Sequence, residues 1–369
     1  MEIDEQIIPM RTQIDAIDKQ ILSLLSRRAS LAQQIGEIKE KNNIAVFKPD
    51  RERAILQALE HSNSGPLSNS SINNIWREII SACRALEGES KVAFLGPNGT
   101  FSEQAMFGYF GRNAKGMPCS SIDEVFRVIE TNQTHFAIVP IENSTEGAVS
   151  RTLDLLLNTS AYIIGELVIG ITHHLLSQHN DFKKAINAAA IIGAHPQALA
   201  QCQHFLNSNP LLKNLERRAM SSNAYAAELA AQDETILAIA SEQAATEYHL
   251  FKIKQHIQDE ANNRTRFIIL GHHKTPSTGN DQTSLMIGIP NEVGAIVKAI
   301  MPFSKFGVSM SRLQSRPAKH QTTSSKDWEY HFLIDIDGHI EDIRVMKAIE
   351  EVKQNSKFIK WLGSYAKIA

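Results

Sequence analysis

A short apolar segment followed by a run of polar residues constrains the fold of this chain more than any other stretch. Phe136 to Val139 has the length of a buried strand, and Pro140 is expected to end its hydrogen-bond ladder. The polar run Glu142–Gly147 follows, and Ala148–Leu157 has the pattern of a helix. Open α/β sheets bind ligands where a strand ends and a helix begins. The alternative is an ordinary turn, in which a serine or threonine of the run caps the helix.

The same succession of strand, polar turn and helix recurs on either side of this segment. Lys91 to Gly96 is apolar and breaks at a polar turn, after which Glu103–Phe110 is expected to be helical. Ala188 to Gly193 likewise leads into a turn and a helix. Two further apolar segments, Ile236–Ala240 and Phe267–Leu270, are expected to be strands. The central part of the chain is therefore predicted to be an α/β fold.

Four motifs in this region resemble those of the prephenate dehydratase family. They are GPNGTFS (96–102), PIENSTEGAV (140–149), AHPQALAQC (194–202) and Thr265–Arg266–Phe267, in the family's order. The resemblance implies a two-lobed α/β domain over residues 90–272, similar to type II periplasmic binding proteins, with prephenate in the cleft between the lobes. An ordinary strand start is the alternative for the last motif.

The resemblance also implies roles for individual residues. Prephenate loses carbon dioxide and water together, and hydroxide is a poor leaving group that needs a proton donor. Thr265 is the residue implied for this role, although a threonine hydroxyl is a weak acid and needs a network or the substrate to activate it. The remaining contacts to prephenate are expected from Thr100, Ser102, Asn143, Ser144, Gln201, Arg266 and Phe267.

Length and composition agree with an enzyme of several domains. A chain of 369 residues is long for one hydrophobic core. The formal net charge of -2 favours neither a nucleic acid nor a membrane surface as a partner. No apolar run reaches the length of about eighteen residues that a membrane span needs, and the acidic start MEIDEQ is unlike a signal peptide, so we expect a cytoplasmic protein. The three scattered cysteines predict no disulfide framework. The histidines are not paired at ligand spacing except at His173–His174 and His272–His273, where neighbours on a strand would face opposite sides, so we expect no metal and no cofactor.

The first forty residues have the pattern of one long helix. Apolar residues recur at spacings of three and four from Ile7 to Ile38, with a single gap at Arg28. A guanidinium in an apolar seam needs an anion as partner. Lys39 returns to nearly the same face about 16 Å along the axis, so the two cations can hold a small dianion. Arg11 lies roughly 25 Å from Arg28 along a straight helix, so it can join that site only from another subunit. The alternative for these cations is a solvated helix face.

Two more helices are expected, from about Asp50 to Leu59 and from Ile72 to Glu87, separated by the polar linker His61–Ser71. With these helices, residues 1–89 resemble the all-helical, three-helix chorismate mutase family. The resemblance implies an intertwined dimer whose first arginine crosses from the partner. It assigns catalytic roles to Arg28, Lys39 and Glu87, and contacts with chorismate to Arg11, Arg51, Glu52 and Cys83.

The sequence departs from the mutase pattern at Lys48, where many members have aspartate, and at Glu87, where some have glutamine. The rearrangement is pericyclic and needs no nucleophile, so the protein holds the reactive conformer and stabilises charge on the breaking ether oxygen. A carboxylate can only accept hydrogen bonds, so Glu87 must be protonated to donate one to that oxygen. The alternative is a solvated residue at a helix end.

The last part of the chain follows a second polar linker, His272–Gln282. Strand and helix patterns then alternate over Ser284–Ile289, Glu292–Lys305, Val308–Ser315, Glu329–Ile336, Ile340–Gln354 and Phe358–Leu362. This order is βαββαβ, a ferredoxin-like module expected over residues 282–369.

Two segments of this module resemble the effector motifs of ACT-type domains. They are Gly294–Ala295–Ile296–Val297 and Leu313–Gln314–Ser315–Arg316–Pro317. The second motif usually opens with glutamate where this chain has Gln314. The resemblance implies that L-phenylalanine binds here as an allosteric inhibitor at a subunit interface. The alternative is that Gly294 merely allows close helix packing.

The favoured hypothesis is a bifunctional enzyme that converts chorismate to prephenate and prephenate to phenylpyruvate, as a homodimer or higher oligomer inhibited by phenylalanine. A mutase fused to a prephenate dehydrogenase would need a dinucleotide fingerprint, and no G-x-G-x-x-G occurs in the chain. A non-enzymatic amino-acid sensor fits the architecture but does not need Arg28, Lys39 or Thr265. A chain with one degenerate catalytic domain is the third alternative. Assays with chorismate and prephenate distinguish these alternatives.

Overall fold

The computed structural model describes residues 2–42, 47, 49–317 and 330–367, apart from the side chains of residues 2–6 and 50. It divides into two compact units, residues 1–90 with 110–115 and residues 91–109 with 116–369. Each unit is described by itself. Lys48, the side chain of Asp50 and the predicted strand start at Glu329 lie outside the described residues.

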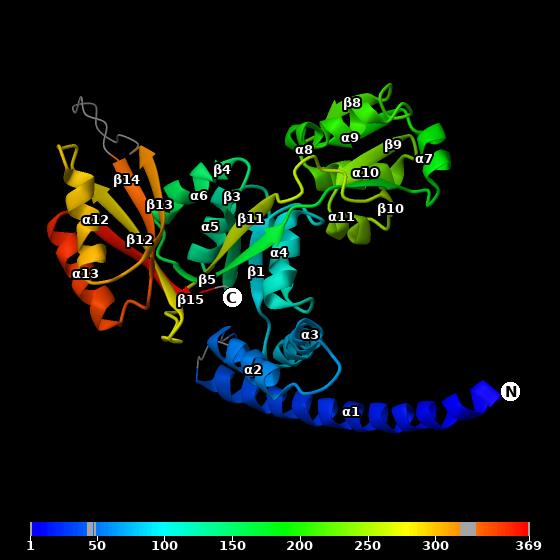
Figure 1. Ribbon diagram of the computed structural model, residues 1–369, viewed down its shortest axis with the longest axis horizontal. Coiled ribbons are helices and arrows are strands. Elements are labelled where there is room, and N and C mark those ends of the chain that lie inside the picture. The colour runs from blue at the N-terminus through cyan, green and yellow to red at the C-terminus, as the bar shows by residue number, and fades with distance from the viewer. Residues whose placement is uncertain (1, 43–46, 48, 318–329, 368–369) are drawn as a thin grey trace. The chain divides into compact units, whose positions relative to one another are not determined.

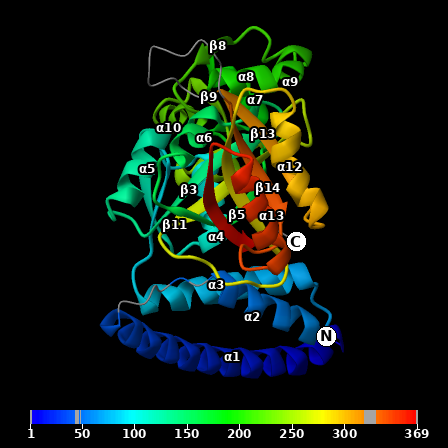
Figure 2. The same cartoon turned by 90° about the vertical axis from the view of Figure 1, so that its left-hand side faces the viewer.

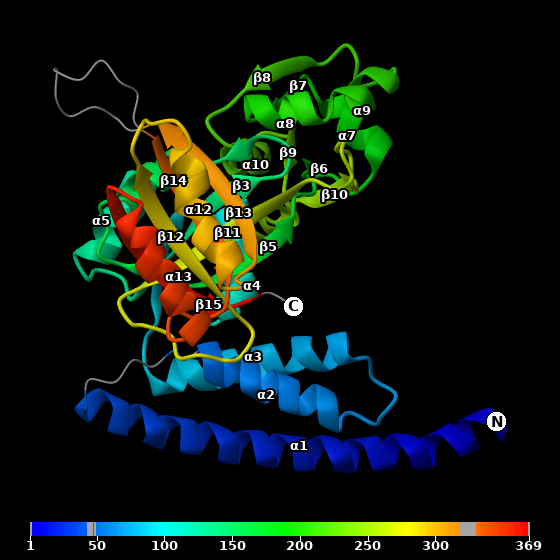
Figure 3. The same ribbon diagram turned by 60° about the vertical axis from the view of Figure 1, so that its left-hand side comes forward.

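The first unit is built from α1 (Glu2–Lys41), α2 (Pro49–Ser62) and α3 (Asn69–Glu87). The single 40-residue α1 confirms the long helix predicted from the apolar periodicity. Figures 1 and 3 show α2 and α3 lying along the C-terminal half of α1. Ser68 caps α3 by accepting from the N–H of Ser71. Among the described helices, none is both long enough and apolar enough to cross a membrane.

The apolar seam of α1 is largely exposed within the single chain. Met10, Ile14 and Ile17 expose 64%, 56% and 52% of their surface. The sequence predicted that this seam packs against other helices, but within the single chain its C-terminal residues Leu31, Ile35 and Ile38 also remain exposed. An exposed apolar stripe of this length is typical of a surface that binds a partner.

The second unit begins with a six-stranded sheet of order β2-β1-β3-β11-β5, with β4 paired to β3. β1 is parallel to β3, and β11 is antiparallel to both β3 and β5. Three helices accompany it, and two of them contribute to its core, α5 through Val125 and Phe126 and α6 through Leu153 and Leu156. The bounds are β1 Lys91–Leu95, α4 Phe101–Phe110, β2 Lys115–Cys119, α5 Ile122–Glu130, β3 Phe136–Asn143, β4 Gly147–Ala148, α6 Ser150–Leu156, β5 Tyr162–Gly170 and β11 Arg264–Gly271.

A second sheet of order β10-β6-β9-β7-β8 forms another lobe, and the chain passes between the lobes from β5 to β6 and from β10 to β11 (Figure 1). Separate apolar clusters involve its strands and helices. The strand predicted over Ala188–Gly193 starts too early, because Ala188 ends α7. The bounds are β6 His174–Ser177, α7 Phe182–Ala188, β7 Ile191–Ala194, α8 Pro196–Gln201, α9 Gln203–Ser208, β8 Glu216–Ala219, α10 Asn223–Gln232, β9 Ile236–Ala240, α11 Glu242–Glu247 and β10 Phe251–Lys254.

The C-terminal module has an antiparallel sheet of order β13-β14-β12-β15, and α12 and α13 cover one of its faces (Figures 2 and 3). The observed order of elements is the predicted βαββαβ. The module also contributes side chains to the apolar core of the first lobe, namely Met286, Leu333, Leu362 and Tyr365. The bounds are β12 Asp281–Ile289, α12 Ala295–Lys305, β13 Met310–Pro317, β14 Tyr330–Asp337, α13 Ile343–Gln354 and β15 Phe358–Ala366.

The prediction that Pro140 ends its strand was wrong. β3 continues to Asn143, and the register with β11 shifts between Arg266 and Phe267, so that one residue of β3 bulges out. Proline is tolerated in a strand at a bulge. The polar run is accordingly a turn between β3 and β4, and neither Ser144 nor Thr145 caps α6, whose N-cap is Val149.

Candidate active sites

A cavity of about 450 Å³ lies in the second unit between the two lobes. The first lobe contributes residues of β1, β3 and β11 and of the loop after β1, and the second lobe contributes loop residues, α8 and the start of α10. Six predicted contact residues line it, namely Thr100, Ser102, Asn143, Gln201, Thr265 and Phe267. A concave site with convergent polar groups is the expected form of a small-molecule site.

Thr265 and Asn143 are directly opposed on β11 and β3. Asn143 Nδ2 donates to Thr265 Oγ1 over 2.8 Å and to Asn263 Oδ1 over 2.9 Å. The Asn143 Oδ1 atom accepts from the N–H of Thr145, which closes the turn and fixes the amide. Because Thr265 Oγ1 already accepts this hydrogen bond, its own proton remains available for donation.

Gln201 is held by a buried histidine. His173 Nε2 lies 3.0 Å from Gln201 Oε1, and the ring packs edge-on against Phe101. Burial lowers the pKa of His173 below its ordinary 6.5, although the hydrogen bond to Gln201 acts in the opposite direction. The lowered pKa favours a neutral ring. Within the described residues, the buried Gln201 Nε2 has no hydrogen-bond partner. The histidine thus orients Gln201 so that its Nε2 amide group can donate a hydrogen bond to a ligand in the cavity.

The loop with Thr100 and the first turn of α4 with Ser102 are held from the opposite lobe. Glu103 Oε2 accepts from the N–H of Gly99 over 2.7 Å and from Gln243 Nε2 over 3.1 Å. Burial raises the pKa of Glu103 above its ordinary value of 4.5. Gly99 has a φ of +82°, a conformation that favours glycine.

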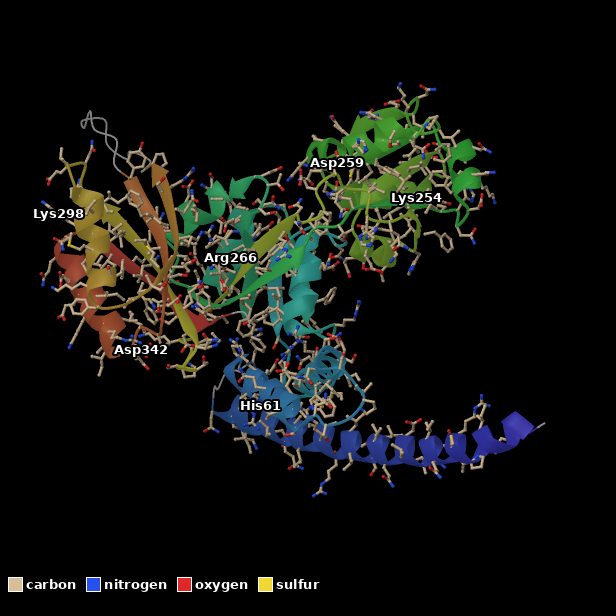
Figure 4. All side chains as sticks on the ribbon, viewed as in Figure 1. His61, Lys254, Asp259, Arg266, Lys298 and Asp342 are labelled. Atoms are coloured by element: carbon tan, nitrogen blue, oxygen red, sulfur yellow. The ribbon has the colours of Figure 1, made fainter. Side chains whose placement is uncertain are left out.

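Two predicted contact residues lie outside the cavity lining. Ser144 Oγ accepts from the N–H of Arg264 over 2.9 Å and so supports the turn. Arg266, marked in Figure 4, points to the other face of the sheet, where it pairs with Glu166 and Asp335. The expectation that Arg266 contacts prephenate is therefore corrected, because successive residues of a strand face opposite sides.

The cavity also contains polar residues that the sequence did not single out as ligands. His195, Gln197, Asn223 and Ser241 line it. The N–H of His195 donates to Asn223 Oδ1 over 2.9 Å, and His195 Nδ1 accepts from the N–H of Gln197 at the start of α8. The AHPQ motif was the available signal, but it does not indicate which of its side chains face the cavity.

In the first unit, Lys39 and Glu87 lie together. Lys39 Nζ is 2.5 Å from Glu87 Oε2, and both side chains are mostly buried. A Cβ added to Gly36 would lie 2.3 Å from the Glu87 carbonyl oxygen, so the glycine permits the close approach of α1 and α3. Arg28 Nη1 lies 3.5 Å from the Ile79 carbonyl oxygen, a contact at the long limit of a hydrogen bond.

The other predicted mutase residues differ in exposure. Glu52 pairs with Arg84, and burial raises the pKa of Glu52 even though Arg84 lowers it. Cys83 is buried, whereas Arg11 and Arg51 are exposed. Because α1 is one continuous helix, Arg11 remains about 25 Å from Arg28.

The predicted effector motifs lie on α12 and β13. Gly294 precedes α12 with a φ of +76°, and a Cβ there would meet nothing within 4 Å. Ala295 is buried, whereas Ile296 and Val297 are exposed. On β13, Leu313, Ser315 and Pro317 are exposed, whereas the partly buried Gln314 donates to the Ser315 carbonyl over 3.4 Å and Arg316 pairs with Asp154 through two hydrogen bonds.

Two protein families match the chain. Residues 92–275 match the family described as Prephenate dehydratase, and residues 10–88 match Chorismate mutase type II. A curated relative from Neisseria gonorrhoeae, named bifunctional chorismate mutase/prephenate dehydratase, is 44% identical over 365 residues, which is 98% of each chain. A relative of the same name from Aquifex aeolicus is 42% identical over 367 residues, again 98% of each chain.

Solved structures resemble the part of the chain outside the first helices. The prephenate dehydratase of Arthrobacter aurescens, described as a complex with L-Phe, is 30% identical with a TM-score of 0.66 and covers 75% of this chain and 90% of that chain. GqqA, described as a quorum quenching acylase, is 26% identical with the same TM-score of 0.66 and covers 75% and 98%. The prephenate dehydratase of Staphylococcus aureus, 23% identical with a TM-score of 0.62, covers 74% and 99% and shows the fold alone.

Proposed function

This chain belongs to the bifunctional chorismate mutase/prephenate dehydratases, and from that membership we propose which of its residues carry each reaction and how the reactions are regulated. Its substrates are chorismate and prephenate. We assign the mutase to residues 1–89, the dehydratase to residues 90–272 and regulation to residues 282–369.

The hydrogen bond from Asn143 to Thr265 carries the dehydratase proposal. As the ring carboxylate of prephenate leaves as carbon dioxide, its bonding electrons complete the aromatic ring and the ring C–O bond breaks. Thr265 Oγ–H donates to the departing hydroxide, which takes up one proton and leaves as water; the threonine recovers its proton from solvent. Asn143 supports this direction of donation, because Thr265 Oγ1 is its acceptor.

The carboxylates of prephenate need donors, and the apolar ring needs contact surface. Gln201 Nε2 is a buried donor oriented by His173, and we assign it to a carboxylate. Thr100, Ser102 and Asn143 line the same cavity and are assigned to the remaining polar contacts. Phe267 supplies an apolar wall.

The mutase site is assigned to Arg28, Lys39 and Glu87, with Arg51, Glu52 and Cys83 around it. The two cations hold the dianion and stabilise negative charge on the breaking ether oxygen. Glu87 acts in its protonated form as a donor to that oxygen, so its pairing with Lys39 has to give way to contacts with chorismate.

A homodimer completes this site. Arg11 is too far along α1 to reach Arg28 in its own chain, and the apolar seam that accompanies it is more than half exposed at Met10, Ile14 and Ile17. A second copy packed along this seam buries it and brings its own Arg11 to the site. Burial of these side chains supplies about 25 cal/mol per Å² toward association.

L-Phenylalanine is the proposed allosteric inhibitor. The Arthrobacter aurescens dehydratase, which resembles 75% of this chain, is described as a complex with L-Phe. We place the effector at Gly294–Val297 and Leu313–Pro317, where the turn at Gly294 gives open access to the exposed N–H groups of α12.

Separate assays test the assignment. Thr265→Val replaces the hydroxyl, which is the proton donor and also the acceptor for Asn143, by a methyl group of similar size. It is expected to lower dehydratase kcat/KM about 100-fold or more while mutase activity stays within about twofold. Arg28→Ala is expected to do the reverse, and Arg27→Ala, which removes an exposed charge from the adjacent position, is its control. Loss of both activities in either folded variant contradicts the assignment.

A further inference from the structure

The residue beside Thr265 on β11 belongs to a buried ionic cluster on the opposite face of the strand. Arg266 Nη1 donates to Asp335 Oδ2 over 2.8 Å, and its Nε donates to Glu166 Oε2 over 2.7 Å. The three side chains expose only 15%, 2% and 8% of their surface. Although burial acts against it, Asp335 raises the pKa of Arg266. The cluster therefore contains a charged arginine that joins the first lobe to β14 of the C-terminal module.

Within the module, the cluster continues through a closed hydrogen-bond network. Tyr365 OH accepts from Arg266 over 3.3 Å and from Gln282 over 3.2 Å. Ser284 Oγ donates to Asp335 Oδ1 over 2.6 Å and lies 2.8 Å from the Tyr365 oxygen. Both Asp335 carboxylate oxygens are thus engaged, which fixes β12, β14 and β15 around one guanidinium.

The partner strand carries a second ion pair to the module, in which Arg312 is 10% and Glu142 39% exposed. Glu142 lies opposite Arg266 and precedes Asn143 in the chain. Its Oε2 is 2.9 Å from Arg312 Nη2, at the distance of an ion pair but without the alignment of a hydrogen bond. The residues adjoining Thr265 and Asn143 therefore both form ion pairs with the module, one through β14 and one through β13.

A buried ion pair such as Arg266–Asp335 determines geometry more than stability. Desolvation offsets much of their attraction, whereas loss of one partner leaves an uncompensated charge. The apolar contacts of Met286, Leu333 and Leu362 in the same region are non-directional by comparison. A shift of β13 or β14 would therefore displace Glu142 or Arg266. Each of these residues is one position from a cavity residue, Glu142 beside Asn143 on β3 and Arg266 beside Thr265 on β11.

We propose that Arg266–Asp335 and Glu142–Arg312, with Tyr365 as their support, couple the effector module to the position of Thr265 and Asn143. These are positioning residues, since they reach the substrate only through their neighbours. The coupling rests on the phenylalanine regulation proposed above. Phenylalanine acts through the cluster by favouring an arrangement of the module strands in which the Thr265–Asn143 pair is displaced from its productive geometry.

The test compares Tyr365→Phe with Lys360→Met in the full-length enzyme. Tyr365→Phe removes one hydroxyl from the cluster and keeps the ring. Lys360→Met removes a different polar link between the module and the first lobe, in which Lys360 Nζ on β15 donates to the carbonyls of Leu156 and Leu157, and Lys360 belongs neither to the cluster nor to the effector motifs. Dehydratase kcat/KM is measured without and with saturating phenylalanine, and phenylalanine Kd is measured by calorimetry.

We expect Tyr365→Phe to bind phenylalanine within about threefold of the parent Kd but to lose about tenfold of its inhibition, within the usual range of coupling. Lys360→Met should retain the parental inhibition. Ser284→Ala, a milder change in the same network, replaces Tyr365→Phe if that variant fails to fold. Undiminished inhibition in the cluster variant overturns the coupling role, and so does loss of phenylalanine binding, which would make the cluster part of the effector site. A parent enzyme that neither binds nor responds to phenylalanine overturns the proposed regulation itself, and the coupling with it.

Discussion

Asn143 donates to the hydroxyl of Thr265 across 2.8 Å, from the strand position directly opposite it. The amide is itself held by the backbone of the turn that follows β3. The hydroxyl is therefore presented with its proton free, whereas an unrestrained threonine would have no preferred direction of donation.

Asn143→Asp reverses this hydrogen bond. A carboxylate can only accept, so Thr265 will donate to the introduced carboxylate oxygen instead of to the substrate, and the new negative charge will repel dianionic prephenate. We expect dehydratase kcat/KM to fall about 100-fold or more, with mutase activity unchanged as the internal control. Activity within about threefold of the parent would show that the direction of this bond is not important.

Gln201 and His173 are expected to act as one unit. Gln201→Leu removes the amide donor and should lower dehydratase kcat/KM about 10- to 100-fold, the range for a hydrogen bond to a charged group. His173→Phe retains a ring but releases Gln201, so it should cause a smaller loss in the same direction. In the double variant the losses should not add. Additive losses would indicate that His173 acts independently of Gln201.

Gly36 is expected to be essential for the geometry of the mutase site. In Gly36→Ala the new Cβ meets the backbone of Glu87, so α1 and α3 must separate beside Lys39. Overpacking of this kind costs about 1–3 kcal/mol, and mutase activity should fall with it. Gly65→Ala is the matched control, because its Cβ would have nothing nearer than 3.8 Å. Equal thermal midpoints and equal mutase rates for the two variants would exclude this role.

The raised pKa of Glu52 predicts that the folded chain becomes less stable as pH rises. Its raised pKa means that the folded chain holds the proton more tightly than the unfolded chain, whose ordinary value is 4.5. Relative to Glu52→Gln, which cannot titrate, the parent should lose stability as pH rises from 4.5 through the raised pKa, and the difference should be constant at higher pH.

Thermal unfolding of both proteins between about pH 4 and 8 measures this difference. The comparison also separates two opposing causes, because burial raises the pKa of Glu52 and Arg84 lowers it. A parent that instead gains stability over this range, relative to the variant, would show that the pairing with Arg84 outweighs burial.

The long helix and the order of the module's elements could be predicted because both depend on local periodicity. The three-and-four spacing of apolar residues extends from Ile7 to Ile38 and specifies one helix whatever it packs against. The close approach at Gly36 could not be predicted, because a glycine within a helical pattern does not indicate which backbone lies opposite it.

The dehydratase site was predicted in part for a similar reason. The motifs placed Thr265, Asn143 and Gln201 in one region, and the cavity contains all of them. The face on which each residue of a strand lies depends on register, which composition does not determine. Arg266 was therefore expected to contact substrate beside Thr265, although alternation along β11 turns it toward Asp335. The cavity role of His195 was missed because its motif gives no side-chain direction.

The bulge in β3 has a consequence for how this site tolerates change. In a regular strand, residues three apart face opposite sides, yet Pro140 and Asn143 both line the cavity. The extra residue at the bulge shifts the phase of the alternation, so that Ile141 joins the core behind the sheet while Glu142 pairs with Arg312. Deletion of Ile141 would leave Pro140, Glu142 and Asn143 in regular alternation, with Asn143 still opposite Thr265, so the core would lose one apolar side chain while the cavity kept its lining. The bulge is therefore a place where this strand can change in length by one residue without turning an active-site residue away from prephenate.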